Sequence, residues 1–269
     1  MAVQQPAVEE LARSFARTAS AAFQDQAESF RSLADDAWSG PTGCAAWTIH
    51  DLAGHIVGEA IWFPHLVRTV TEGAPPLPNE LWEELKYLPG REIADRMSEA
   101  AQQLVPAVDG TTPEQLQQPV DLGFTVPLWQ ALWICMFEAV LHNWDGRAGR
   151  EPGATIPTAW AQRLADSSVE FAPALAHREA ARDAAGRYLL DVGDGVGPIT
   201  VSALDGEVTV ERARMGNADV TIHVTADQYV RLLAGRLPLR AAMDKGEVTI
   251  DGDRTRAENL NRLFAGVGG

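Results

Sequence analysis

The sequence predicts an α+β protein in which an N-terminal four-helix bundle is followed by a smaller α+β domain. Apolar residues recur at helical spacing through roughly the first 150 residues. From Arg187 onward the pattern changes to short β-branched runs separated by glycine. The charge also differs between the halves, because residues 1–155 hold 9 Lys and Arg against 21 Asp and Glu, whereas residues 156–269 hold 13 against 16.

Four amphipathic helices are expected in the first half. They span about residues 7–35, 48–72, 91–108 and 128–147. Thr48 is a natural N-cap, and Asp51 three residues later favours the positively charged helix start. Pro64 is expected to kink the second helix or divide it in two. Four such helices in succession are typical of a bundle, whose core often holds a metal site built from facing helices.

The second half is expected to form an antiparallel sheet covered by helices. Strands are expected at 188–192, 199–204, 208–210, 220–224 and 248–250, and helices at 225–233 and 257–264. The pair Asp205-Gly206 is a favoured two-residue hairpin turn. We therefore expect a first domain of residues 1–151, a helical connector of residues 152–184 and an α+β domain of residues 185–269.

Length, charge and hydropathy exclude several classes of protein. A chain of 269 residues is long enough for a substantial core. The net charge of −15 argues against nucleic acid and against an anionic membrane surface as partners, because phosphate groups need a basic patch. No apolar run approaches the ~20 residues of a membrane span, and the N-terminus has no signal pattern. Two cysteines do not make a disulfide framework, so we expect a cytoplasmic protein.

His55, Glu138 and His142 are the candidate metal ligands. Glu138 and His142 are four residues apart on one expected helix, so their side chains project from the same face, and His55 lies on another helix. Two imidazoles and a carboxylate that converge between helices give a three-ligand site with one open position, which is the arrangement of a catalytic divalent metal. The helix around Glu138 is apolar nearly all round. A buried glutamate without a partner is costly, so it is expected to face a cation or a strong hydrogen-bond donor.

Several nearby residues have two interpretations. A lone histidine such as His55 is often only a packing residue, and Glu–His pairs at this spacing also occur by chance. Asp145, three residues after His142, either orients that imidazole or forms a surface pair with an arginine. Cys135 lies on the same helix face as Glu138 and His142, and it is either a soft metal ligand or an inert buried thiol. Cys44 is either reactive or a packing residue at the entrance of the bundle.

Two separated segments carry a family resemblance. Residues 47–55 read W-T-x-x-D-L-x-x-H, and residues 138–145 read E-x-x-x-H-x-W-D. Over about residues 5–150 the chain thereby resembles the mycothiol-dependent maleylpyruvate isomerase family, which is related to the DinB-like bundles. The resemblance implies a DinB-like metal-binding four-helix bundle in which the zinc ligands are His55, Glu138 and His142. Residues 232–253 look like part of a sterol-carrier-protein-2-like domain, which accompanies the bundle in this family.

The resemblance implies a mycothiol-dependent S-transferase or isomerase. A zinc ion can hold a thiol as its thiolate at neutral pH, and the thiolate would attack a small electrophilic substrate. Arg212, Arg214 and Arg240 are candidates for an anionic substrate group, although each is also readable as a solvated surface arginine. Two alternatives remain: a non-catalytic protein that binds lipids or other small ligands, and a metal-dependent hydrolase that uses bound water.

Overall fold

The computed structural model describes residues 7–78, 80–213 and 216–265. Contacts between Cα atoms group the chain into two compact units, Met1–Ala154 and Thr155–Gly269. The helical residues from 155 to 184, which the sequence suggested as part of a connector, are therefore grouped with the second unit.

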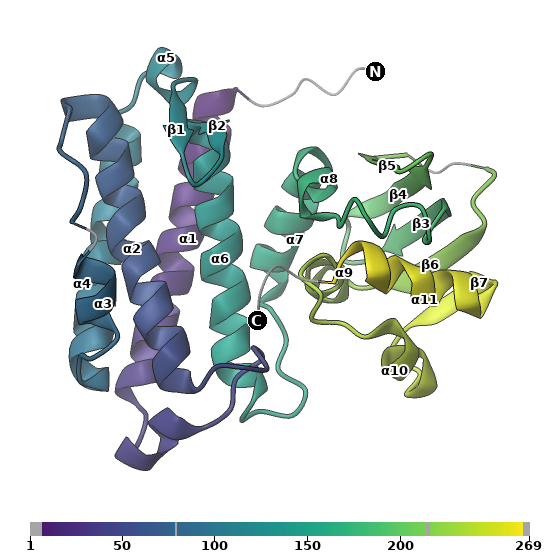
Figure 1. Cartoon of the computed structure of the whole chain (residues 1–269), viewed down its shortest axis with the longest axis horizontal. Helices are drawn as coiled ribbons and strands as arrows, with labels where there is room; N and C mark the ends of the chain where they lie inside the picture. Colours follow the sequence, from purple (N-terminus) through teal and green to yellow (C-terminus); the bar gives the residue numbers. More distant parts are fainter. Residues whose placement is uncertain (1–6, 79, 214–215, 266–269) are drawn as a thin grey trace. The chain divides into compact units, whose positions relative to one another are not determined.

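The first unit is built on four long helices that run side by side (Figure 1). They are α1 (Val8–Arg31), α2 (Ile49–Glu72), α4 (Gly90–Asp109) and α6 (Leu128–Ala148). Helices α1 and α2 each pack against both α4 and α6. The shared core includes Phe15, Phe23 and Phe30 of α1, which are almost completely buried. The four-helix bundle expected from the periodicity is confirmed.

Helix α2 begins with the expected cap. The Thr48 hydroxyl accepts a hydrogen bond from the Asp51 amide at 3.2 Å, and the Asp51 carboxylate accepts one from the Thr48 amide at 2.9 Å. The helix then continues without interruption past Pro64, so the expected division at this proline is wrong. A proline removes only one N–H from the helix, and here the ring is buried in the bundle, whose packing holds the helix together.

Short elements that the sequence did not predict complete the first unit. They are η1 (Asp35–Ser39), α3 (Glu80–Leu85), α5 (Pro113–Leu116) and the hairpin strands β1 (Pro119–Asp121) and β2 (Thr125–Pro127). Helix α3 lies closely against α2 at two glycines. A Cβ atom on Gly58 would lie 2.0 Å from the ring of Trp82, and one on Gly54 would lie 3.3 Å from the Cα atom of Lys86. Glycine at these two positions therefore lets α3 approach.

The second unit contains a five-stranded sheet in the order β5-β4-β3-β6-β7. The strands are β3 (Gly186–Val192), β4 (Gly197–Leu204), β5 (Glu207–Glu211), β6 (Val220–Val224) and β7 (Thr249–Gly252). The turn between β4 and β5 is the predicted one, since Asp205 and Gly206 both have positive φ, at 54° and 83°. The expectation of a fully antiparallel sheet is wrong, because β6 pairs with β3 in parallel. Alternating polarity marks strands but does not specify their neighbours.

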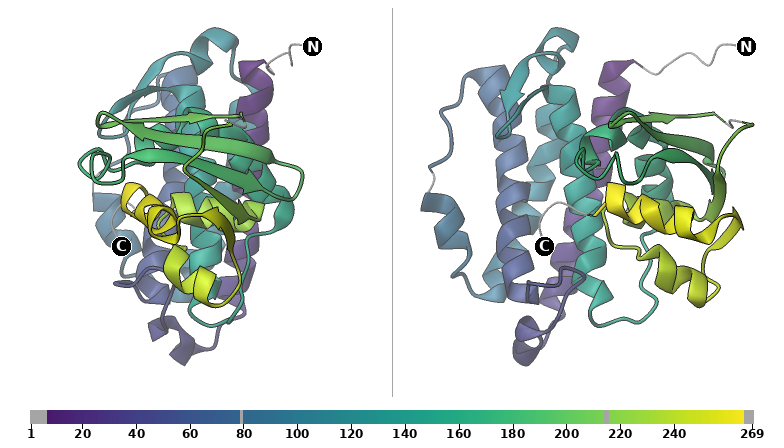
Figure 2. Two further views of the ribbon diagram at one scale, coloured as in Figure 1. Left: turned by 90° about the vertical axis from the view of Figure 1, so that its right-hand side faces the viewer. Right: turned by 45° about the vertical axis from the view of Figure 1, so that its right-hand side comes forward.

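Helices accompany this sheet on its flanks. They are α7 (Thr158–Ser167), α8 (Ala172–Leu175), α9 (Ala226–Leu233), α10 (Leu239–Asp244) and α11 (Arg254–Leu263), with the short turn η2 (Ser168–Glu170). Helices α9 and α11 contact both β3 and β6, and Figure 2 shows α11 running beside the sheet. The mixed α+β class expected from the sequence is confirmed. Among the helices of the described residues, none has the length and apolar character needed to cross a membrane.

Candidate metal centre

The structure brings together the three predicted ligand residues, which we call the ligand cluster: His55, Glu138 and His142. The Nε2 atom of His142 lies 3.1 Å from Oε2 of Glu138, and Nε2 of His55 lies 3.7 Å from the same oxygen. One donor atom from each residue lies within 4.8 Å of the other two. Helices α2 and α6 pack against each other, and the four-residue spacing on α6 points Glu138 and His142 to one side.

The electrostatics of the ligand cluster favour a carboxylate anion. Burial would raise the pKa of Glu138, but the hydrogen bond from His142 and the nearby His55 imidazole outweigh it and hold that pKa well below its ordinary value. Burial would likewise lower the pKa of His142, but its hydrogen bonds to Asp145, Cys44 and Glu138 hold it well above the usual range. Positive charge on the His142 imidazole therefore stabilises the carboxylate at the place where a cation would sit.

Asp145 lies on the other side of the His142 ring. Its Oδ2 atom accepts a hydrogen bond from Nδ1 of His142 at 2.9 Å, and its side chain is completely buried. Asp145 is thus buried and not at the surface, where one of its two interpretations from the sequence placed it in a pair with an arginine. The contact fixes the imidazole so that Nε2 is directed at Glu138, which is the usual arrangement of a carboxylate that orients a metal-binding histidine.

Sequence reasoning did not predict that Cys44 contacts Asp145 and His142. The Cys44 thiol donates a hydrogen bond to Oδ2 of Asp145 at 3.2 Å and lies 3.9 Å from Nδ1 of His142. Donor atoms of these three residues also lie within 4.8 Å of one another. Cys44 precedes Asp145 by 101 residues, so no local spacing signals the contact. Cys135, by contrast, is completely buried, and its burial raises the pKa of its thiol well above the ordinary value.

The loop before α2 closes over the ligand cluster. The ring of Trp47 lies 5.0 Å from that of His55 and 5.8 Å from that of His142, measured between centroids. The Gly43 amide donates to the Asp145 carbonyl at 2.8 Å, and a Cβ atom on Gly43 would lie only 2.2 Å from Oδ1 of Asp145. The loop therefore reaches the buried carboxylate because residue 43 has no side chain.

The donor set fits a divalent cation such as zinc. Because Nδ1 of His142 bonds to Asp145, Nε2 is the ring atom that could bind a metal, and His55 and Glu138 could add a nitrogen and a carboxylate oxygen. Two imidazoles and one carboxylate are a common ligand set of catalytic zinc. The side chains of His55 and Glu138 are 31% and 28% exposed, so the cluster is also open to a further ligand.

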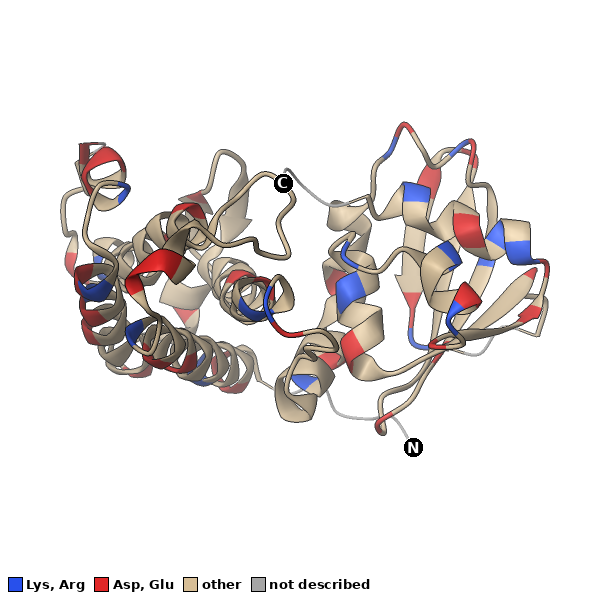
Figure 3. Ribbon diagram, turned by 90° about the horizontal axis from the view of Figure 1, so that it is seen from below, with Lys and Arg blue, Asp and Glu red and all other residues tan. Residues whose placement is uncertain are grey.

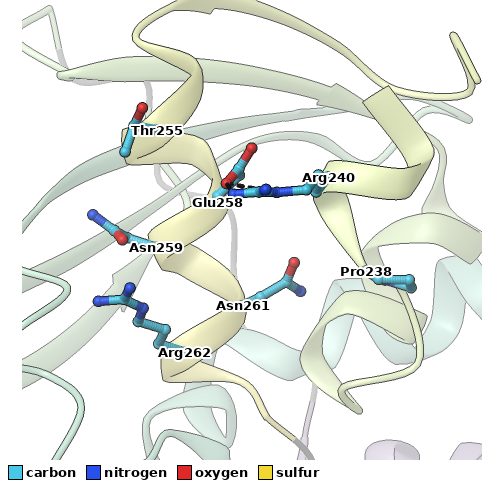
Figure 4. Close-up of a pocket in the computed structure, with 7 residues that line it drawn as sticks. All are labelled: Pro238, Arg240, Thr255, Glu258, Asn259, Asn261 and Arg262. Atoms are coloured by element: carbon cyan, nitrogen blue, oxygen red, sulfur yellow. Dashed lines mark hydrogen bonds and ion pairs between the residues drawn. The ribbon is translucent and has the colours of Figure 1, made fainter. Parts of the chain in front are cut away.

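Two of the three arginine candidates of the second unit, Arg212 and Arg240, form ion pairs with acidic side chains. Arg240 lines a pocket of about 310 Å³ and pairs there with Glu258 through contacts of 3.0 and 2.5 Å (Figure 4). Arg212 pairs with Asp166 at 2.5 Å and donates to the Val196 carbonyl at 2.8 Å. Arg214 lies outside the described residues. Arg212 and Arg240 are thus tied into the surface of the second unit.

The fold and the site define a two-domain protein with a histidine–glutamate–histidine cluster in a helical bundle. Residues 16–147 match the model of the mycothiol maleylpyruvate isomerase N-terminal domain, and residues 169–265 match that of the SCP-2 sterol transfer family. The chain therefore carries the domains of these two families in that order, and the resemblance inferred from the two sequence motifs is confirmed.

Solved structures share this architecture. The crystal structure of a mycothiol-dependent maleylpyruvate isomerase matches with a TM-score of 0.56 and 19% identity, covering 85% of this chain and 89% of that one. A mutant of a mycothiol-dependent maleylpyruvate isomerase matches over the same shares with a TM-score of 0.55 and 18% identity. At such identities the likeness concerns the fold. No curated protein matches the chain significantly.

Proposed function

We propose that this protein is a zinc-dependent enzyme that uses mycothiol as cosubstrate and acts on a small electrophile, as an isomerase of the maleylpyruvate type or as an S-transferase. The observation that carries the proposal is the clustering of His55, Glu138 and His142 inside a domain of the mycothiol maleylpyruvate isomerase family. Zinc held there would lower the pKa of a thiol, so that the sulfur is available as thiolate at neutral pH.

The chain's own residues prepare this site. Asp145 holds the Nδ1 proton of His142, so that Nε2 is the ring atom that faces Glu138. Glu138 supplies one negative charge, which balances part of the charge of a divalent cation. The Trp47 ring packs against both imidazoles and so covers one side of the ligand cluster. These groups need little rearrangement during a reaction, and such preorganisation is what makes an active site effective.

The reaction expected of the thiolate is addition to an activated double bond. A C–S bond forms and the π electron pair moves onto the adjoining acceptor group. Rotation about the resulting single bond, followed by elimination, gives the trans isomer and returns the thiol. Protonation without elimination gives a thioether, which is S-transfer. The sulfur comes from the cosubstrate, because Cys135 is buried and the Cys44 thiol is bound to Asp145.

Elemental analysis together with a thiol-dependent assay tests the proposal. The wild-type protein should bind about one zinc per chain, and His142→Ala or His55→Ala should lose most of it. His65→Ala is the matched control, since His65 is on the same helix but bonds to the Pro75 carbonyl at 2.6 Å. Mass spectrometry should detect isomers or thioethers when mycothiol and electrophiles such as maleylpyruvate are supplied. Undiminished turnover without any thiol would contradict the proposal and favour a hydrolase.

The match of the second unit to the SCP-2 sterol transfer family supports a second candidate, which is binding of an apolar ligand. A carrier of this kind should bind fluorescent fatty acids equally well before and after treatment with a chelator. An enzyme of the proposed kind should lose turnover after the same treatment. The two measurements on one preparation separate the candidates.

A further inference from the structure

A cavity of about 600 Å³ lies beside the ligand cluster, within the first unit. We call it the α3 cavity, because its far wall comes from α3 and the residues that follow. His55 belongs both to the lining of this cavity and to the ligand cluster, so a molecule in the cavity would reach the proposed metal. Three aromatic side chains also line it: Trp47, Trp82 and Tyr87. A volume of this size suits a small-molecule ligand.

The wall of the α3 cavity is held in place by close packing. The Trp82 ring lies over Gly58, where any side chain would approach within about 2 Å of it, and the backbone at Lys86 lies over Gly54. Gly54 also lines the cavity, and the absence of a side chain there leaves the space open. Trp82 and the backbone at Lys86 are therefore positioned by close contacts with α2.

The charges in the cavity do not select an anion. Lys86 forms an ion pair with Glu83 at 2.7 Å, and His50 bonds through Nε2 to the Leu88 carbonyl at 3.0 Å. The lining also contains Asp51, and hydrogen bonds from Thr48 lower the pKa of that carboxyl group, which keeps it ionised. Figure 3 shows acidic segments spread over the helices of the bundle. A carboxylated ligand would meet balanced or negative charge here, whereas a neutral ligand with hydroxyl groups would not be repelled.

Aromatic faces combined with polar groups are suited to a sugar ring. The C–H faces of a sugar can lie on aromatic rings, and its hydroxyls can bond to carboxylate and ammonium groups at the edge. Trp47, Trp82 and Tyr87 provide the faces, while Asp51 and Lys86 provide the polar partners. Mycothiol is a thiol built on a neutral pseudodisaccharide, so its chemistry matches this lining.

We propose that the α3 cavity binds the sugar portion of the thiol cosubstrate and directs its sulfur toward His55 and the ligand cluster. This inference rests on the proposed function, and it names the residues that would distinguish mycothiol from simple thiols. Tyr87 and Trp82 are the specificity-determining side chains.

The test uses a sugar probe without sulfur, N-acetylglucosaminyl-inositol, and the zinc-loaded full chain. Calorimetric titration should show binding to the wild-type protein and a Kd raised about 3–10-fold in Tyr87→Ala, since aromatic contacts contribute about this much. Tyr87 is 81% exposed, so its removal should leave the fold and the zinc content intact. Phe124→Ala is the matched control, because Phe124 is an exposed aromatic residue of the β1–β2 hairpin, 58% exposed, and does not line the cavity. Trp82→Phe provides a second variant.

Steady-state kinetics provide the complementary measurement. Tyr87→Ala should raise KM for mycothiol with little change in kcat, and it should leave the reaction with N-acetylcysteine, which lacks the sugar, unchanged. Failure of the probe to bind, or equal binding by wild type, Tyr87→Ala and Trp82→Phe, would overturn the assignment of the cavity. If mycothiol still supports turnover in that case, the proposed function stands. If no thiol supports turnover, the proposed function falls, and the titration alone decides the cavity.

Discussion

Replacing Asp145 by asparagine should weaken zinc binding by about 10–100-fold and leave the fold intact. The carboxylate is completely buried and accepts hydrogen bonds from His142 at 2.9 Å and from the Cys44 thiol at 3.2 Å. Asparagine keeps the shape of the side chain but removes its charge. A hydrogen bond to a charged group contributes about 1.5–3 kcal/mol, against about 0.5–1.5 kcal/mol for a neutral one. The difference is about 1–1.5 kcal/mol for one hydrogen bond and about 2–3 kcal/mol for both, which corresponds to a change in affinity of about 10–100-fold.

Competition with a chromophoric chelator measures this affinity. Asp95→Asn is the control, because it removes the same charge from an exposed carboxylate that pairs with Arg31 at 2.9 Å. Its zinc affinity should stay within about twofold of wild type, since exposed ion pairs contribute little. Wild-type affinity in Asp145→Asn would refute the orienting role. Loss of all zinc from Asp145→Asn, as expected for His142→Ala, would instead make Asp145 a direct ligand.

Three further predictions concern the surroundings of the ligand cluster. Cys44→Ala should weaken zinc binding a few-fold, and Cys44→Ser should restore it, because a hydroxyl also donates to Asp145; the same chelator competition measures both. Gly43→Ala should lower stability by about 1–3 kcal/mol in urea denaturation, because its Cβ would lie 2.2 Å from Oδ1 of Asp145. Burial, together with a neighbouring carboxylate, raises the pKa of Glu59 from 4.5 to about 8. The folded metal-free protein then binds this proton more tightly than the unfolded chain, so its stability should fall as the pH rises from about 4.5 to 8. Glu59→Gln should flatten that slope in urea denaturation at a series of pH values, and an unchanged slope would contradict the assignment.

Features determined by neighbouring residues were predictable from the sequence. The cap formed by Thr48 and Asp51 and the turn at Asp205-Gly206 depend on residues within three positions of each other, and the structure contains both. The same holds for the pair Glu138 and His142, whose common direction follows from helical geometry. Predicting that His55 lies near this pair required only the assumption that the two apolar helices face each other.

Features determined by distant contacts were not predictable. Helix α3 has only six residues, and its position depends on the small volumes of Gly54 and Gly58 on another helix. The parallel pairing of β3 with β6 depends on where the chain returns to the sheet, and the alternating pattern of a strand carries no information on its neighbour. The Cys44 thiol reaches Asp145 across 101 residues, and only the packed loop brings them together.

His142 is enclosed between two carboxylates, Glu138 on Nε2 and Asp145 on Nδ1. A protonated imidazole forms an ion pair with both carboxylates, so the charges of the ligand cluster are balanced in the metal-free protein. If zinc binds as proposed, the cation would replace the proton on Nε2 of His142. The bundle should therefore stay folded when the metal is removed, and it should bind metal again when zinc is added. On acidification, zinc should be released at a higher pH than that at which the helices unfold.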